Sequence, residues 1–357
     1  MKMSKKIFFI LDAVEKGGAG NVVNILVESL KEKYEIYVVT FMEFPIKEKM
    51  GFRYIALQGN NPVIRRSLYC KILKLRNMLY KEKPDIIISF SSKINLYTIL
   101  AKVNLNGKLI ICERNDPFHE PHTWLRRCIR NFSYSLFNVK YAVFQTLEAE
   151  KYFSRVLFSK TAIIENPLKE NLPFWKENLN SSVIITAARL DKQKNLMMMI
   201  KAFSLFYRKH SESKLFIFGE GPLREELEKN ITLMKMQECI FLPGNISNIH
   251  EKMSEARMFL LSSNYEGCSN ALLEAMAIGV PVISTDHPIG GARMFIKNGE
   301  NGVLVDVNDY NAMYRAMEMI YNGSDFSYKL SQNSRKIRNR LNIDIIKKKW
   351  IEFIETI

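Results

Sequence analysis

The stretch YEGCSNALLEAMAIGVPVIST, residues 265–285, contains the parts of an α/β unit in one short segment. Its small residues at 267–270 predict a turn, and the apolar run after them predicts a helix over about 271–278. That run is apolar nearly all round, which is typical of a buried helix. VPVIST then predicts a short buried strand. Glu266 and Glu274 stand eight residues apart in this segment and need an explanation, because a buried carboxylate requires a partner.

The same alternation continues in both directions along the chain. Runs rich in apolar and β-branched residues are separated by stretches of helical periodicity: KIFFILD, EIYVVTF, DIIISF, KLIICE, YAVFQT, TAIIEN, SVIITAAR, SKLFIFG, CIFLPG, RMFLLSS and GVLVD. Such alternation indicates parallel sheets covered on both faces. Residues 166–182, NPLKENLPFWKENLNSS, contain two prolines and no periodicity, which favours an interdomain linker. We predict an α/β protein with two doubly wound parallel-sheet domains, 1–168 and 169–340, facing a cleft. A helix at 341–357 is expected to return to the first domain.

The bulk composition is that of a globular protein. The 357 residues are 47% hydrophobic and 25% charged, which suits two domains. The five cysteines form no C-x-x-C pair, which predicts reduced thiols in the cytoplasm. The histidines form no H-E-x-x-H set and no D-x-D pair occurs, so we expect no metal and no other cofactor. The apolar run near the start is too short for a secretory signal, and no run is long enough to span a bilayer.

The net charge of +15 is concentrated in the first half of the chain. Residues 1–168 hold 27 Lys and Arg against 15 Asp and Glu, a net +12, and the remainder carries +3. This asymmetry predicts an anionic partner for the first half: a membrane surface, a nucleic acid or a phosphorylated acceptor. Residues 65–83 and 124–137 mix basic and apolar side chains at helical spacing, as on a membrane-surface helix. The alternative is two ordinary helices whose apolar sides face the sheet. No nucleic-acid-recognition signature is present, so we expect no nucleic acid.

The second half contains a candidate anion site. Arg189 and Lys194 follow the strand-like run SVIITAA and together could hold one diphosphate. Alternatively, they are two solvated surface cations. Ser269 and Asn270 are good N-cap residues, and the free N–H groups at the helix start favour an anion. Glu274, inside that helix, could accept two hydrogen bonds from a ribose diol.

These motifs resemble family 4 of the retaining glycosyltransferases, in particular members that make bacterial surface polysaccharides. The resemblance rests on ARLDKQKN, FGEGP, LPGN, the segment 265–285 and GGARMFIKNGENGVLV, with the glycine-rich EKGGAGNVV near the start. It implies the GT-B fold of two Rossmann-like domains and a nucleotide-sugar donor. It further implies roles for matching residues of the second half. Arg189 and Lys194 would bind the diphosphate, Glu266 the donor sugar and Glu274 the ribose. Phosphate and sugar contacts are expected near Ser269, Asn270 and Ala271, base contacts near Gly219 and Asn245, and closure over the phosphates by Gly17 and Gly18 of the first half.

The chain departs from the family pattern in the first half. Where many relatives carry a histidine facing the donor sugar, this sequence reads CERNDPFHEPH. Arg114 is our candidate for that place, as a catalytic residue alongside Arg189, Lys194 and Glu266, and His119 is the alternative. The acidic residues around Arg114 could equally form a solvated loop.

The resemblance implies retaining transfer of a hexosyl or N-acetylhexosaminyl unit from a nucleotide-diphosphate sugar, with UDP as the expected nucleotide. The expected acceptor is a lipid-diphosphate-linked or growing glycan in capsule, O-antigen or exopolysaccharide synthesis. With the basic first half, this predicts a cytoplasmic enzyme bound peripherally to the anionic inner face of the cell membrane. The alternatives are a GT-B-type sugar-nucleotide epimerase and a catalytically silent subunit that binds an anionic surface.

Overall fold

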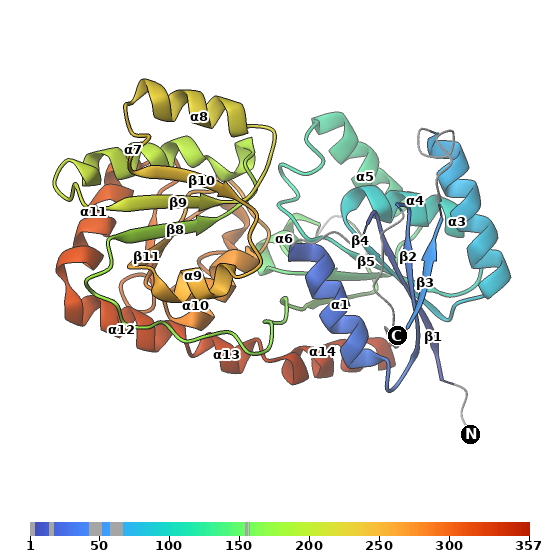
Figure 1. Ribbon diagram of the computed structural model, residues 1–357. Helices are drawn as coiled ribbons and strands as arrows, with labels where there is room; N and C mark the ends of the chain where they lie inside the picture. Colours follow the sequence, from blue (N-terminus) through green and yellow to red (C-terminus); the bar gives the residue numbers. More distant parts are fainter. Residues whose placement is uncertain (1–3, 14–17, 43–51, 58–66, 154–155, 157) are drawn as a thin grey trace. The chain divides into compact units, whose positions relative to one another are not determined.

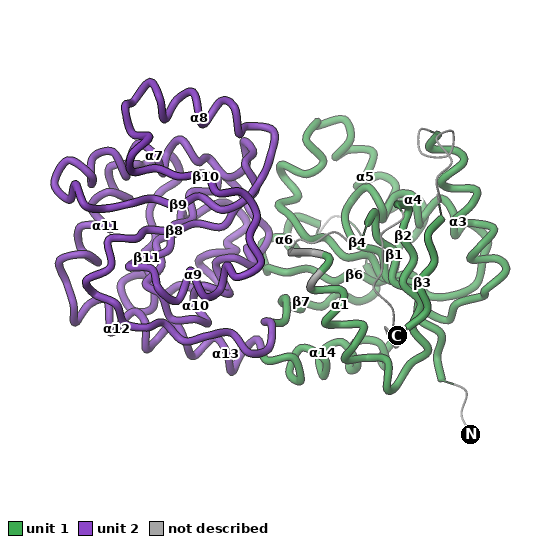
Figure 2. Tube along the Cα trace, viewed as in Figure 1, with its two compact units in different colours: residues 1–167, 342–357 green, residues 168–341 purple. Residues whose placement is uncertain are grey.

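The computed structural model describes residues 4–13, 18–42, 52–57, 67–153, 156 and 158–357. The chain forms two compact units (Figure 2). Unit 1 comprises residues 1–167 and 342–357, and unit 2 comprises residues 168–341. Our prediction on Gly17, and the first residues of the predicted basic helix at 65–83, lie outside the described residues.

Unit 1 is built on a parallel sheet whose described strands have the order β3-β2-β1-β4-β5-β6-β7 (Figure 1). The strands are β1 Lys6–Leu11, β2 Glu35–Thr40, β3 Arg53–Ala56, β4 Ile86–Phe90, β5 Lys108–Cys112, β6 Tyr141–Phe144 and β7 Lys160–Ile163. The helices are α1 Gly18–Leu30, α3 Leu68–Glu82, α4 Ser92–Lys102, α5 Trp124–Leu136, α6 Leu147–Tyr152 and α14 Ile343–Glu355. Every residue of β4 is buried, as expected for a central strand covered on both faces.

Unit 2 repeats the architecture with the strand order β10-β9-β8-β11-β12-β13, again all parallel. The strands are β8 Val183–Ala187, β9 Lys214–Phe218, β10 Ile240–Gly244, β11 Met258–Leu261, β12 Val282–Thr285 and β13 Val303–Val305. The helices are η1 Lys192–Lys194, α7 Leu196–Tyr207, α8 Arg224–Leu233, α9 Ile249–Glu255, α10 Asn270–Ile278, η2 Pro288–Gly290, α11 Tyr310–Asn322, α12 Ser324–Ser334 and α13 Ile337–Arg340. The predicted fold class, two doubly wound parallel-sheet domains, is confirmed.

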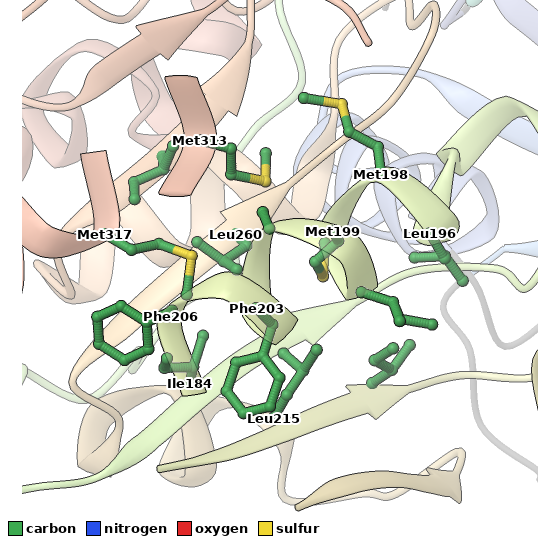
Figure 3. Packing of buried hydrophobic residues seen from close by; sticks show 14 of the residues in the cluster. Ile184, Leu196, Met198, Met199, Phe203, Phe206, Leu215, Leu260, Met313 and Met317 are labelled. Carbon is green, nitrogen blue, oxygen red and sulfur yellow. The ribbon is translucent and has the colours of Figure 1, made fainter. Parts of the chain in front are cut away.

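The core of unit 2 lies between the sheet and helices α7 and α11. Figure 3 shows Met199 and Phe203 of α7 packed with Met317 of α11 and with residues of the strands. Methionine and phenylalanine fill this space without polar atoms that would need partners. Because α7 begins directly after the loop that follows β8, this packing also fixes the position of that loop.

Residues 168–182 form no helix or strand but are bound to unit 2. Trp175 is buried, and its indole N–H donates to the carbonyl of Ala256 at 2.7 Å. Its backbone N–H donates to the carbonyl of Ile278, the last residue of α10, at 2.8 Å. The segment is therefore anchored along α9 and α10.

The last helix, α14, belongs to unit 1. Trp350 on its inner face is fully buried, and Tyr34 donates a hydrogen bond to Glu355 at 2.9 Å. Lys349 pairs with the buried Glu165 at 2.6 Å. No helix among the described residues has both the length and the apolar content needed to cross a bilayer.

Candidate donor-binding site

The predicted site residues of unit 2 lie where the order in which the strands are added to the sheet reverses. β8 and β11 are hydrogen-bonded neighbours, yet the chain visits β9 and β10 between them. Ligands of open α/β sheets bind at such a switch point, outside the carboxyl ends of the strands. Arg189 and Lys194 follow β8, and Glu266 follows β11, so the topology brings these residues to one place.

The loops after β8 and β11 are joined by hydrogen bonds. The backbone N–H of Asn264 donates to the carbonyl of Gln193 at 2.7 Å, and the Ser262 hydroxyl donates to the carbonyl of Lys194 at 2.8 Å. Asp191 caps the turn η1 by accepting from the backbone N–H of Lys194 at 3.3 Å. These contacts hold the Lys194 backbone firmly. Arg189 differs, because its side chain is 71% exposed and its Nε lies 3.6 Å from Asp191 Oδ2.

Glu266 is the most heavily bonded carboxylate of the site. It is 6% exposed and forms an ion pair with Lys194. Oε1 also accepts from the Ser263 hydroxyl at 2.7 Å, and Oε2 accepts from Gln193 Nε2 at 3.2 Å. A buried carboxylate is stable when a cation and hydrogen-bond donors compensate its lost hydration. Glu266 and Lys194 are thus one electrostatic unit.

The start of α10 offers backbone donors beside this pair. Of the two predicted N-cap residues, Ser269 occupies the position and Asn270 is already helical; the Ser269 side chain makes no capping hydrogen bond. The first N–H groups of an α-helix have no partner within the helix, and the helix dipole favours an anion there. Asn270 and Ala271 are the first two helical residues. The arrangement can bind a phosphate through backbone atoms.

The turn before α10 is held by a close backbone approach. A Cβ atom built on Gly291 would lie 1.9 Å from the carbonyl oxygen of Gly267. Gly291 has ordinary helical dihedral angles, so glycine is required here by space and not by conformation. Neighbouring Ile289 has φ +69°, a strained value for a β-branched residue. The loop after β12 therefore supports the Gly267 turn.

Glu274 lies one turn into α10, as predicted, and its side chain is 17% exposed. Its Oε2 accepts a hydrogen bond from His250 Nε2 at 2.9 Å, and its Oε1 lies 3.8 Å from Lys169 Nζ. The partner that a largely buried carboxylate requires is thus supplied by α9 and by the segment before β8. The sequence held no signal for these partners, which are distant along the chain.

The glycine loops predicted near the base pack against each other and against the loop after β8. The backbone N–H of Gly219 donates to the carbonyl of Gly244 at 2.9 Å. Gly219 has φ +138°, and a Cβ atom there would lie 1.9 Å from the carbonyl oxygen of Ala188. Asn245 follows and is exposed. The loops after β8, β9 and β10 therefore lie against one another.

His287 is a site neighbour that the sequence prediction missed. It follows β12 and is fully buried, and its Nδ1 donates to the carbonyl of Pro288 at 3.1 Å. Burial lowers its pKa, and the nearby charge of Glu266 opposes the shift only in part. Its Nε2 has no hydrogen-bond partner within the described part of the chain. Its position directly after an apolar strand was the available signal.

In unit 1, the predicted residues fall into two places. Gly18 is the first residue of α1. Arg114 follows β5: its Nη1 donates to Asn166 Oδ1 at 2.9 Å, and its guanidinium lies 4.9 Å from the Phe90 ring centroid and 6.0 Å from that of Trp350. Arg114 is thus surrounded by residues from β4, from the segment after β7 and from α14. Its catalytic role stays a prediction.

The acidic residues around Arg114 are not a solvated loop. Glu113 is 3% exposed and accepts hydrogen bonds from Ser92 at 2.7 Å, from Asn95 at 3.1 Å and from Tyr134. Burial, together with the charge of Glu113, raises the pKa of Tyr134 well above its ordinary value. Asp116 is fully buried and lies 2.7 Å from His119 Nδ1. That alternative reading is therefore wrong for Glu113 and Asp116.

No group of three or more His, Cys, Asp or Glu side chains among the described residues is arranged to hold a metal ion. The expectation that donor binding needs no metal stays a prediction.

Comparisons with known proteins agree with this geometry. Residues 169–337 match the family model of the glycosyl transferases group 1. Over 98% of both chains, the protein is 27% identical to a Campylobacter jejuni enzyme, the GalNAc-alpha-(1->4)-GalNAc-alpha-(1->3)-diNAcBac-PP-undecaprenol alpha-1,4-N-acetyl-D-galactosaminyltransferase. It is 26% identical, over 94% of both chains, to a 4-alpha-N-acetylgalactosaminyltransferase of the same organism that acts on a diphospho-undecaprenol glycan.

Solved structures share the fold over the whole chain. The Anabaena protein HepE in complex with UDP and glucose superposes with a TM-score of 0.85 at 17% identity, covering 99% of this chain and all of that one. Sucrose-phosphate synthase from Thermosynechococcus elongatus gives the same TM-score at 17% identity, with 99% and 98% covered. The chain is a sugar-transferring enzyme of the GT-B fold, and its residues 169–337 match the group 1 glycosyl transferases.

Proposed function

We propose that this enzyme transfers an N-acetylhexosaminyl or hexosyl unit from a UDP-sugar to a lipid-diphosphate-linked glycan, with retention of anomeric configuration. The observation that carries the proposal is the arrangement at the β8–β11 switch point. Lys194, Glu266 and the start of α10 meet there, and Glu274 lies one helical turn further on. Together they match the charge pattern of a nucleotide-diphosphate sugar.

The donor would bind along this row of groups. The diphosphate is anionic, so Arg189, Lys194 and the N–H groups at the start of α10 stabilise it and the charge that develops as it leaves. Glu266 would accept hydrogen bonds from sugar hydroxyls, and Glu274 from the ribose diol. UDP as the nucleotide is supported by the bound UDP in HepE, a protein of the same fold. We propose that these groups do the work without a metal.

Retention is proposed to proceed by attack on the donor's front face. A double displacement would need a carboxylate free to attack the sugar carbon. Glu266 is instead bound by Lys194, Ser263 and Gln193. These contacts suit a carboxylate that accepts hydrogen bonds from donor-sugar hydroxyls, and not a nucleophile. In front-face attack, the acceptor oxygen bonds to the anomeric carbon as the bond to the diphosphate oxygen breaks. The acceptor proton passes to that oxygen.

The acceptor class is supported by the surface of α5 in unit 1. This helix buries polar side chains, Arg130, Ser133 and Tyr134, and presents its apolar ones outward. The exposed apolar residues are Trp124, Leu125, Ile129, Phe132 and Leu136. The alternative of an ordinary covering helix with its apolar side on the sheet is therefore wrong for α5.

An exposed apolar stripe on a basic unit suits a peripheral contact with an anionic membrane. The names of the two Campylobacter jejuni relatives give glycans on diphospho-undecaprenol, a lipid, as their acceptors. We therefore propose that the enzyme works at the inner face of the cell membrane, with its acceptor lipid embedded there.

The test is a transfer assay with UDP-N-acetylgalactosamine, UDP-N-acetylglucosamine and UDP-glucose, each offered with a polyprenyl-diphosphate-linked glycan in vesicles. The expected product is the acceptor extended by one sugar in α-linkage, seen by mass spectrometry and by the anomeric coupling constant. An inverted β-linkage would overturn retention. An epimerised donor without acceptor extension would favour the epimerase, and no turnover with any donor would favour a silent subunit.

A further inference from the structure

His250 occupies a position that links two parts of the candidate site. It is the second residue of α9, which follows the loop after β10, and α9 packs against α10. Its Nε2 lies 2.9 Å from Glu274 Oε2. Because a carboxylate oxygen can only accept, His250 Nε2 is the donor in this hydrogen bond. Both side chains are largely buried, at 15% and 17% exposure.

The hydrogen bond restricts the orientation of the Glu274 carboxylate. A glutamate side chain has three rotatable bonds, and fixing it costs conformational entropy that binding must otherwise offset. His250 binds one oxygen and Lys169 lies near the other, so the carboxylate plane is set before any ligand arrives. Each oxygen can still accept another hydrogen bond. A pair of adjacent hydroxyls fits such an acceptor.

We propose that His250 is a positioning residue that orients Glu274 for the ribose diol of the donor and so sets the selectivity for ribose hydroxyls. This inference rests on the proposed function, in which Glu274 binds the ribose. It assigns a role to a residue that carries no part of the diphosphate or sugar machinery. Loss of His250 leaves Glu274 in place but releases its carboxylate.

The chain contains a matched control pair. His210 Nε2 lies 2.9 Å from Glu318 Oε1, with side-chain exposures of 16% and 19%. This pair joins the segment between α7 and β9 to α11, away from the carboxyl ends of the strands. It has the same chemistry and burial as the pair of His250 and Glu274, so a structural effect of losing a histidine–glutamate bond should appear at both.

The experiment measures, by calorimetry, the affinities of the full-length protein for UDP and for 2′,3′-dideoxy-UDP, which lacks both ribose hydroxyls. We expect wild type and His210→Phe to prefer UDP by about tenfold or more. His250→Phe and His250→Ala should lose most of this preference through weaker UDP binding, with dideoxy-UDP affinity nearly unchanged. His250→Gln, whose amide can donate to Glu274, should recover part of it.

The outcomes separate the two claims. If wild type prefers UDP and both loss variants keep the full preference, His250 does not position Glu274, and the proposed donor site stands. If wild type binds UDP but does not distinguish it from the dideoxy compound, the ribose role of Glu274 fails and this inference fails with it. If His210→Phe loses the preference as His250→Phe does, the effect is structural and the inference is overturned.

Discussion

Lys194 and Glu266 form an ion pair between the loops that follow β8 and β11, with side-chain exposures of only 16% and 8%. The cation proposed for the diphosphate is therefore neutralised by the carboxylate proposed for the sugar. On the proposed function, a bound donor would place two negative charges beside Lys194 and hydroxyl groups beside Glu266, so neither side chain would be left as a buried, unpaired charge. The ion pair would then couple occupancy of the phosphate and sugar subsites.

Removing one partner of this pair should destabilise the protein and abolish most activity. We expect Lys194→Ala to lower the free energy of unfolding by about 3 kcal/mol, because Glu266 is left buried without its cation. The double variant Lys194→Gln with Glu266→Gln should recover most of that loss but no activity. Urea denaturation and transfer rates measure both. Lys176→Ala, which breaks an exposed pair with Glu255, is the control and should change stability by less than about 0.5 kcal/mol.

Gly291→Ala should damage the site through the Gly267 turn. The added methyl group would overlap the Gly267 carbonyl oxygen, so the turn before α10 must move. We expect at least about a tenfold loss of transfer rate, since small displacements of positioned groups cost large factors. Gly299→Ala serves for comparison, because no atom lies within 4 Å of its Cβ position, although its φ of +73° carries a strain cost. Equal activity in the two variants would show that the Gly267 turn does not form the site.

Much of unit 2 was predictable because its signals are local. Small residues before an apolar helix gave Ser269 and Asn270 as N-cap candidates, one of which is the N-cap, and alternating apolar runs predicted the strands. The partners of the two glutamates were not predictable in this way. His250 and Lys169 reach Glu274 from segments far away in sequence, and Gln193 and Ser263 reach Glu266 because two loops are joined by hydrogen bonds. Such contacts depend on tertiary packing, which periodicity does not encode.

For a related reason, the sequence did not decide whether the apolar face of α5 points outward or toward the sheet. An amphipathic pattern predicts that a helix has two faces but not which face meets the sheet. In the structure, Arg130 is buried because Nη2 donates to the carbonyl of Pro117 at 3.1 Å and its guanidinium lies 4.7 Å from the Phe153 ring centroid. Those partners turn the polar side inward, and the apolar side is left exposed.

Substitutions on that face should weaken membrane binding. We expect wild type to bind vesicles containing anionic phospholipid at low salt, and less at high salt. Trp124→Ser with Phe132→Ser should reduce binding by about tenfold or more, because each ring contributes on the order of 1.5–3 kcal/mol when buried in the interface. Vesicle co-sedimentation measures this. Leu233→Ser in unit 2, where the side chain is 70% exposed, should bind as wild type does. Undiminished binding by the α5 variant would refute this surface as the contact.

Stability should fall in mildly acidic solution because of His287. Burial lowers its pKa below the ordinary value of 6.5, so the folded protein holds it neutral while the unfolded chain can protonate it. Above about pH 6.5 the residue is neutral in both the folded and the unfolded protein, so it does not change the free energy of unfolding. As the pH falls from there toward the folded pKa, only the unfolded chain gains a proton, and the free energy of unfolding decreases. His287→Gln removes the titrating group, so its stability should vary less between pH 7 and pH 5. Denaturant midpoints across this range test the point, and identical slopes would contradict it.

The most direct measurement is calorimetric titration of UDP and GDP, without added metal, into wild type and Glu274→Ala. We predict that UDP binds wild type, and that its binding free energy weakens by about 1–3 kcal/mol in the variant because the ribose loses a charged hydrogen-bond acceptor. The diphosphate contacts at Lys194 and α10 remain in that variant, so weak binding should persist. If UDP does not bind, the donor site is not at the β8–β11 switch point as described. If UDP binds both proteins equally well, Glu274 does not bind the ribose.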